Sequence, residues 1–137
     1  MARDKIHQAV KNALINDGWT ILADPFKIEY KEFELSADLA AEHAFSAERG
    51  EQKIVVEIKT FGGRSFVKDL QQALGQYEIY HDILVENILE YDLYLGVSDS
   101  VYNTFFQQQA TQLIVQRHQM KLLVVDLERE EIVTWRK

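Results

Sequence analysis

The sequence predicts a mixed α/β fold, in which helices cover a central sheet of parallel and antiparallel strands. Apolar residues recur at helical spacing in two stretches that lie far apart in the chain. Short runs rich in β-branched residues lie between and after these stretches. The 137 residues are 47% hydrophobic and 27% charged, which is a globular composition, and we expect a single domain over residues 1–137. The predicted order of elements is α-β-β-β-α-β-α-α-β-β.

The first predicted element is a helix from Arg3 to Asp17. Ile6, Val10 and Leu14 recur every four positions and would form one apolar stripe. Gly18 follows at the place where a helix takes a left-handed cap. This helix should therefore pack on the sheet through its stripe and end at Gly18.

The next part of the chain predicts extended structure. Residues 19–23 form a short apolar run that Asp24-Pro25 closes, because proline cannot donate a hydrogen bond to a strand ladder. Residues 33–48 lack helical periodicity and should be extended. Arg49-Gly50-Glu51 is predicted as a hairpin turn. It leads into Lys53–Lys59, whose β-branched residues make it the strongest predicted strand.

A long helix is expected after this strand, from Phe66 to Glu86. Gly62-Gly63 would end the strand, and Ser65 can cap the helix. The length of this helix indicates a central packing role. The remaining predicted elements are a buried strand over residues 91–97, a helix from Ser98 or Asp99 to Phe106, a helix over 109–119, and a closing hairpin of strands 122–125 and 131–135.

Composition and charge exclude several classes of protein. The absence of Cys excludes disulfides, thiolate zinc sites and Cys nucleophiles. Without a long apolar run or a signal sequence, we expect a soluble, cytoplasmic protein with no membrane partner. The net charge of -7 argues against a general nucleic-acid coat. The charge is uneven, because residues 49–68 carry five basic and two acidic groups, whereas residues 69–100 carry seven acidic groups and no Lys or Arg.

The motif with the clearest chemistry is Glu57-Ile58-Lys59. Alternation along a strand places Glu57 and Lys59 on one face and Ile58 on the other. The chain contains two similar triplets, Glu29-Tyr30-Lys31 and Glu51-Gln52-Lys53, but Glu57-Ile58-Lys59 alone lies in an apolar strand. An acid and a lysine are costly there unless they pair or bind something. A solvated strand face with a cross-strand ion pair is the alternative.

Asp38 is the candidate partner of Glu57. Antiparallel pairing through the turn near Gly50 can bring the two carboxylates together, but the count from that turn puts Asp38 beyond the direct partner of Glu57, so a bend or bulge is expected. Capping a turn is the alternative role of Asp38. Two carboxylates and the Ile58 carbonyl are oxygen ligands suited to Mg²⁺ or Mn²⁺. With Lys59 to orient water and offset phosphate charge, the set predicts phosphodiester hydrolysis.

Asp38, the strand motif and the following helix together resemble the PD-(D/E)XK nuclease core. The helix carries Gln76 and Tyr80, which match the Gln-x-x-x-Tyr pattern of that superfamily and lie one turn apart. The match over almost the whole chain is more specific, because three stretches resemble the XisH family of cyanobacterial excision-controlling factors. These stretches are ARDKIHQAVKNALINDGWTI, VVEIKTFGGRSFVKDLQQALGQYEIY and LYLGVSDSVYNTFF.

The resemblance implies a restriction-endonuclease-like fold and a metal-dependent endodeoxyribonuclease that uses Mg²⁺ or Mn²⁺. The implied catalytic residues are Asp38, Glu57, Lys59 and Gln76, and the implied metal ligands are Asp38, Glu57 and Ile58. The implied supporting residues are His7, Gln72 and Tyr80, and the candidate DNA phosphate contacts are Arg49, Lys53, Arg64 and Lys68. The chain departs from the superfamily pattern in two places. Ala37 stands where the nuclease motif has Pro. On the first helix, some members carry a glutamate as a further metal ligand, and the polar residues of this chain that could take its place are His7 and Asp4.

The family name also implies a biological setting. In the XisH family it refers to excision of the fdxN DNA element during heterocyst development, together with a recombinase and a small companion protein, XisI. DNA and an XisI-like protein are therefore the expected partners, and a homo-oligomer stays open. The alternative is a catalytically silent subunit that binds a protein or a DNA structure without cutting. Glu78, Asp82 and Glu86 form an acidic stripe on the long helix, which is either a docking surface for a cationic partner or an ordinary solvated face.

Overall fold

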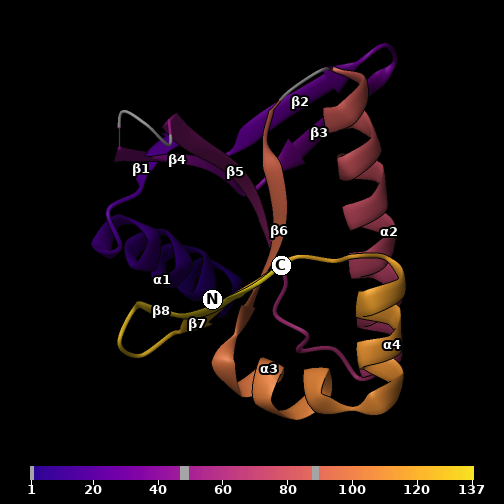
Figure 1. Ribbon diagram of the computed structural model, residues 1–137. Coiled ribbons are helices and arrows are strands. Elements are labelled where there is room, and N and C mark those ends of the chain that lie inside the picture. Colours follow the sequence, from indigo (N-terminus) through magenta and orange to yellow (C-terminus); the bar gives the residue numbers. More distant parts are fainter. Residues whose placement is uncertain (1, 47–49, 88–89) are drawn as a thin grey trace.

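The computed structural model describes residues 2–46, 50–87 and 90–137 (Figure 1). The helices in these residues are α1 (Ala2–Asn16), α2 (Phe66–Glu86), α3 (Asp99–Thr104) and α4 (Gln109–Arg117), with a 3-10 turn, η1 (Phe105–Gln107), after α3. The strands are β1 (Thr20–Ala23), β2 (Phe26–Tyr30), β3 (Phe33–Ala37), β4 (Leu39–Ser46), β5 (Gly50–Ile58), β6 (Asp92–Ser98), β7 (Leu122–Asp126) and β8 (Glu131–Arg136). None of these helices combines the length and the apolar content needed to cross a lipid bilayer.

Six strands form a mixed central sheet in the order β1-β4-β5-β6-β7-β8. β5, β6 and β7 run parallel to one another, and the other neighbouring pairs are antiparallel. Parallel neighbours need a crossover connection, which α2 supplies between β5 and β6 and the α3–α4 segment supplies between β6 and β7. The predicted mixed α/β fold is therefore confirmed.

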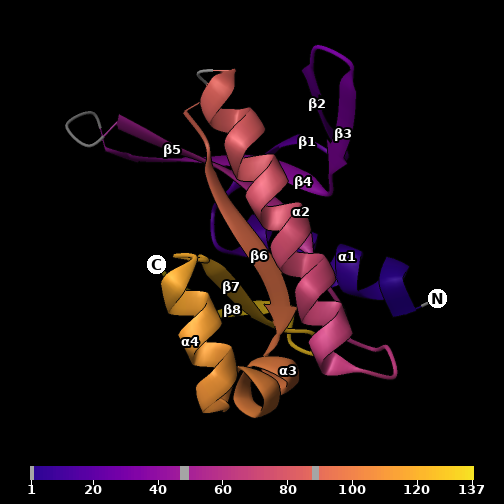
Figure 2. The same ribbon diagram turned by 90° about the vertical axis from the view of Figure 1, so that its right-hand side faces the viewer.

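Helices cover both faces of the sheet. α1 lies against one face, whereas α2 and α4 lie on the other, and Figure 2 shows α2 crossing in front of β6. The side chains of β5 alternate between the two layers. Ile54 and Val56 pack in the core beneath α1, and Val55 packs in the core beneath α2. All three are fully buried, which explains why this strand is a continuous apolar run.

The predicted residues cap the two long helices, although α1 spans Ala2–Asn16 and not Arg3–Asp17. Gly18 adopts a φ of 93°, and its N–H donates a hydrogen bond of 3.0 Å to the carbonyl of Ile15 at the end of α1. α2 begins after Ser65, whose hydroxyl accepts a hydrogen bond of 3.3 Å from the N–H of Lys68. This side-chain cap satisfies one of the free N–H groups of the first turn.

The segment before the site differs from the prediction. β2 and β3 pair as a separate two-stranded sheet, although the sequence predicts no strand over residues 26–30. Lys31 turns the chain between them with a φ of 51°. Residues 33–48 are also not one extended segment, because β3 ends at Ala37 and β4 begins in the other sheet. Asp38 is the residue between them and so lies where the chain passes from one sheet to the other.

Two predicted boundaries also need correction. Gly50 and Glu51 belong to β5 rather than to a turn, and Arg49, the other residue of the predicted turn, lies outside the described residues. α4 ends at Arg117 instead of at residue 119, and Gln119 has a φ of 49° where the chain turns toward β7.

Candidate active site

The pairing of β4 with β5 sets Asp38 opposite Glu57. Leu39 pairs with Val56, so the residue before Leu39 faces the residue after Val56. The expected bulge near Asp38 is not needed, because the hairpin turns earlier than the sequence predicts. The register shift of this strand pair lies instead at residues 44–46, far from the site.

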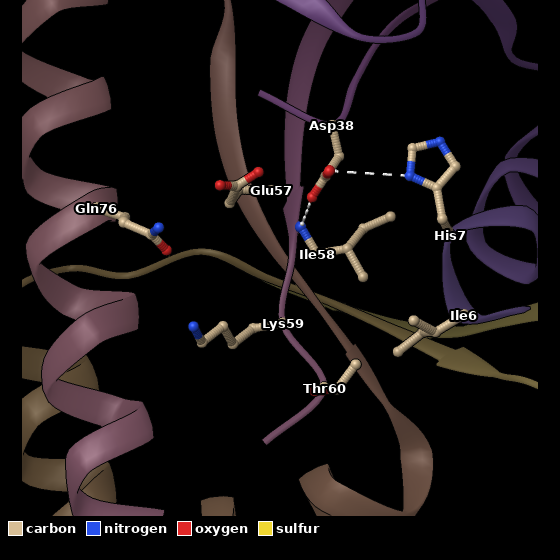
Figure 3. A pocket seen from close by; sticks show the side chains of 8 residues that line it. All are labelled: Ile6, His7, Asp38, Glu57, Ile58, Lys59, Thr60 and Gln76. Carbon is tan, nitrogen blue, oxygen red and sulfur yellow. Dashed lines mark hydrogen bonds and ion pairs between the residues drawn. The ribbon is translucent and has the colours of Figure 1, made fainter. Parts of the chain in front are cut away.

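Asp38 and the strand motif meet at the end of β5 (Figure 3). Glu57 and Lys59 point toward α2, and Ile58 points to the opposite side, as strand alternation predicts. The carboxylate of Asp38 is held by the strand itself, because its Oδ2 accepts a hydrogen bond of 2.7 Å from the Ile58 N–H. One carboxylate oxygen is therefore fixed by backbone before any ligand arrives.

A cavity of about 180 Å³ opens beside these residues, which is room for several water molecules. Its walls come from α1, the junction between β3 and β4, the end of β5, and α2. The lining residues are Ile6, His7, Asp38, Glu57, Ile58, Lys59, Thr60 and Gln76. The structure thus brings the proposed metal ligands, the lysine, the glutamine and the helix histidine to one cavity.

Glu57 is an ionisable group in an unfavourable place. Its side chain is buried, with 9% of its surface exposed. Burial raises the pKa of Glu57 to about 8, and the adjacent carboxyl group of Asp38 adds to the rise through a hydrogen bond and through its charge. A hydrogen bond from Tyr80 acts in the opposite direction. Without a cation, the two carboxyl groups therefore retain a proton at neutral pH.

Polar side chains of α2 face the same site. Lys59 Nζ donates a hydrogen bond of 3.0 Å to Gln72 Oε1, so the helix holds the lysine in place. Gln76 lies one turn further along and lines the cavity. Tyr80 lies another turn along, is buried, and donates a hydrogen bond of 3.2 Å to the Ser36 carbonyl. Spacing of four residues therefore aligns three predicted site residues in one stripe.

Three of the candidate DNA phosphate contacts lie in the described part of the chain, and none of these three lines the cavity. Lys53 is half-buried in β5, four residues before Glu57. Arg64 and Lys68 are exposed at the start of α2, and Lys68 lies one turn before Gln72. Arg49 lies outside the described residues. The role of Arg64 and Lys68 as DNA contacts therefore stays a prediction.

Sequence reasoning missed one charged group next to the cavity. Asp24 accepts hydrogen bonds from Lys11 Nζ at 2.7 Å and pairs with His7 Nε2 at 2.8 Å. The sequence marks Asp24 only as part of the strand-ending Asp24-Pro25 pair. The contact joins a helix to the end of a strand, and no local spacing in the sequence signals it.

One protein family matches nearly all of the chain. The family model described as XisH protein matches residues 1–133. The chain belongs to the XisH family.

Two solved structures resemble this XisH chain. An XisH family protein from Nostoc punctiforme PCC 73102 is 36% identical, with a TM-score of 0.88, over 97% of this chain and 99% of that chain. An fdxN element excision controlling factor protein from Anabaena variabilis is 38% identical, with a TM-score of 0.88, over 98% of this chain and 99% of that chain. A comparison with curated proteins finds no match.

The donor set of this XisH chain suits a hard divalent cation. Asp38 and Glu57 contribute carboxylates, and Ile58 contributes a carbonyl, which are the oxygen donors that Mg²⁺ and Mn²⁺ prefer. A cation would offset the burial and the adjacent Asp38 carboxyl group, which together raise the pKa of Glu57. Within the described part of the chain, no group of three His, Asp or Glu side chains is arranged to hold a metal ion by itself. Water or phosphate oxygens would therefore complete the coordination.

Proposed function

We propose that this XisH chain is a PD-(D/E)XK-type, metal-dependent endodeoxyribonuclease. The observation that supports this most strongly is the strand register that sets Asp38 opposite Glu57 at a cavity. Lys59 lies on the same face as Glu57, and Gln76 reaches the cavity from α2. Groups from separate elements thus converge in the order of the superfamily motif.

The residues divide the chemistry between them. Asp38, Glu57 and the Ile58 carbonyl would hold Mg²⁺ or Mn²⁺, which supplies Lewis-acid activation of water and stabilises phosphate charge. Asp38 is oriented for this role by the Ile58 N–H. Lys59, positioned by Gln72, places a positive charge where the attacked phosphate gains negative charge. Glu57 would act as a ligand in its ionised form, so cation binding would have to displace the proton that burial favours.

The test is DNA cleavage by the purified full chain with Mg²⁺ or Mn²⁺ and with EDTA. Supercoiled, single-stranded and branched DNA are compared. Cleavage should require the cation and should be lost in Glu57→Gln and Lys59→Met. Glu51→Gln is the matched control, because Glu51 is exposed and lies on the same face of the same strand. No cation-dependent cleavage of any substrate, or equal cleavage by Glu57→Gln, would contradict the proposal.

The biological role that we propose is control of DNA excision. The similar protein from Anabaena variabilis is an fdxN element excision controlling factor, and we extend that role to this chain. Nicking or binding of DNA at an element boundary is a step that such a rearrangement requires. A nuclease site at Asp38 and Glu57 would give such a factor a direct action on DNA.

A second candidate function is that of a silent subunit that binds an XisI-like protein. The acidic stripe favours it, since Asp82 is 77% exposed and Glu86 is exposed on α2. Glu78 differs, because it lies 3.7 Å from His118. The test is a pull-down with the XisI-like protein at low and moderate salt, using Glu78→Lys/Asp82→Lys/Glu86→Lys. Binding by this variant as tight as that of the unmodified chain at both salt levels would exclude the stripe as the docking surface.

A further inference from the structure

A groove of about 790 Å³ lies between α2 and α4, and we call it the α2–α4 groove. Its walls come from α2, the C-terminal end of α4, the starts of β6 and β7, and the end of β8. Figure 2 shows α4 and the C-terminus on one side of α2 and α1 on the other. None of the described residues lines both this groove and the cavity at Glu57. The groove is therefore separate from the candidate active site.

The α2–α4 groove is basic, although the chain as a whole is acidic. The whole chain has 15 Lys and Arg against 22 Asp and Glu, whereas the groove is lined by four Lys or Arg and two Asp or Glu. Both acidic groups already have a partner in the groove. Asp92 Oδ1 lies 3.2 Å from Lys121 Nζ, and Glu78 lies 3.7 Å from His118. The other cations of the groove are exposed, and they are Arg117, Arg136 and Lys137.

These three cations have no anionic partner within residues 2–46, 50–87 and 90–137. No ion pair or side-chain hydrogen bond there involves Arg117, Arg136 or Lys137. Arg117 lies in the last turn of α4, where the helix dipole favours a cation. Arg136 and Lys137 lie at the end of β8 and have no such support. Like charges that line one groove repel one another, so a bound anion would stabilise all three.

Apolar surface also lines the α2–α4 groove. Tyr77, Leu93 and Met120 are buried side chains that reach its wall. The Tyr77 hydroxyl is already used, because it donates a hydrogen bond of 3.2 Å to the Leu93 carbonyl and accepts one of 3.0 Å from the Lys121 N–H. These residues therefore offer carbon surface, which suits an apolar side chain better than a bare phosphate.

The surface next to the groove is unfavourable for a long polyanion. Glu78 lines the groove, and Asp82 and Glu86 continue from it along α2. Asp82 is 77% exposed, and Glu86 is exposed too. A DNA strand that extended past the groove along α2 would be repelled by these carboxylates. A short acidic segment avoids this repulsion.

We infer that the α2–α4 groove binds an acidic segment of a partner protein. Carboxylates of the segment would contact Arg117 and Arg136, whose guanidinium groups match carboxylate geometry. An apolar side chain between these carboxylates would contact Leu93 and Met120. This inference does not depend on the proposed nuclease activity, because the groove shares no lining residue with the cavity among the described residues.

The probe is the end-blocked peptide Glu-Glu-Leu-Glu-Glu, titrated into the ¹⁵N-labelled full chain and followed by nuclear magnetic resonance. Amide signals of residues 115–121 should shift and reach saturation. Raising the salt concentration should weaken binding by screening the charges. The same peptide with Gln in place of each Glu should bind about 10-fold more weakly or worse. Replacing its Leu with Ser should also weaken binding, because the apolar contact is lost.

The decisive variant is Arg117→Glu/Arg136→Glu, which makes two attractive charges repulsive and should weaken binding of the acidic peptide by about 10-fold or more. The control is Arg129→Glu, which reverses an exposed arginine in the turn before β8, outside the groove. It should leave peptide binding unchanged. Circular dichroism melting checks that each variant is folded.

Three results would overturn the inference while leaving the proposed function intact. The first is no saturable shift with the acidic peptide, or equal binding by the folded Arg117→Glu/Arg136→Glu variant. The second is a single-stranded oligonucleotide that shifts the same signals at lower concentration, which would assign the groove to nucleic acid. The third is a dimer in sedimentation that this variant dissociates, which would assign the groove to a second copy of the chain.

Discussion

Replacing Glu57 with Gln should make the cation-free protein more stable at alkaline pH. In the folded chain the pKa of Glu57 is raised from 4.5 to about 8, first by burial and then by Asp38. Below pH 4.5 the residue is protonated in both the folded and the unfolded state, and its neutral form fits the site. As the pH rises through 8, the folded state must accept a buried carboxylate, and the stability that came from the neutral form is lost.

The size of this effect follows from the two pKa values. The unfolded chain releases the proton near pH 4.5 and the folded chain releases it near pH 8. At about 1.4 kcal/mol for each pKa unit, the loss in free energy of unfolding between pH 4.5 and pH 8 is on the order of 5 kcal/mol. A glutamine side chain cannot ionise, so Glu57→Gln should not show this loss. The variant should then exceed the unmodified chain by several kcal/mol at pH 9.

The assay is urea unfolding in EDTA at several values from pH 5 to pH 9. Trp19 and Trp135 provide the fluorescence signal, because their rings lie 5.4 Å apart in the core beneath α1. Glu51→Gln serves as the control for removing an exposed glutamate from the same strand. Parallel stability curves for the unmodified chain and Glu57→Gln would refute the reasoning, since titrating groups away from the Asp38–Glu57 pair cancel in the difference.

Three further predictions concern the site and its supporting loop. Millimolar Mg²⁺ or Mn²⁺ should raise the melting temperature by binding the folded state, and Asp38→Ala or Glu57→Ala should abolish the rise; an identical rise in the double variant would exclude this site. Cation binding near neutral pH should release about one proton from the Asp38–Glu57 pair. Calorimetry in buffers of different ionisation enthalpy should detect this proton. Binding without proton release would mean that Glu57 is already ionised. Gly63→Ala should reduce the free energy of unfolding by about 1 kcal/mol, because a Cβ at residue 63 would lie 2.8 Å from Asp69 Oδ1. The same carboxylate accepts a hydrogen bond from the Gly63 N–H, which the substitution would disturb. Urea unfolding should show a smaller loss when Gly63→Ala is made in an Asp69→Ala background.

Local chemistry made much of the fold predictable. α2 has the predicted bounds, because Ser65 is a strong cap and the apolar spacing between it and Glu86 is helical. Gly18 ends α1 as expected, because positive φ at a helix end favours glycine. The alternation of Glu57 and Lys59 also follows from the strand alone. These features depend on residues close together in the chain.

The missed features depend on conformations or contacts that the sequence does not signal. The β2–β3 turn uses Lys31 in a left-handed conformation, where glycine or asparagine would have indicated a turn. The sequence predicts the β4–β5 turn too late in the chain, so the predicted partner of Glu57 lies after Asp38. The observed register places Asp38 directly opposite Glu57. Asp24 and its contacts with Lys11 and His7 join segments that are distant in the chain. Pairing across such distances is set by packing and not by local pattern.

The most direct test of the account is the anomalous diffraction of Mn²⁺ in crystals of this chain. The account predicts one Mn²⁺ peak between the carboxylates of Asp38 and Glu57, within bonding distance of both. Carboxyl groups that stay hydrogen-bonded to each other at millimolar Mn²⁺, with no peak between them, would contradict it.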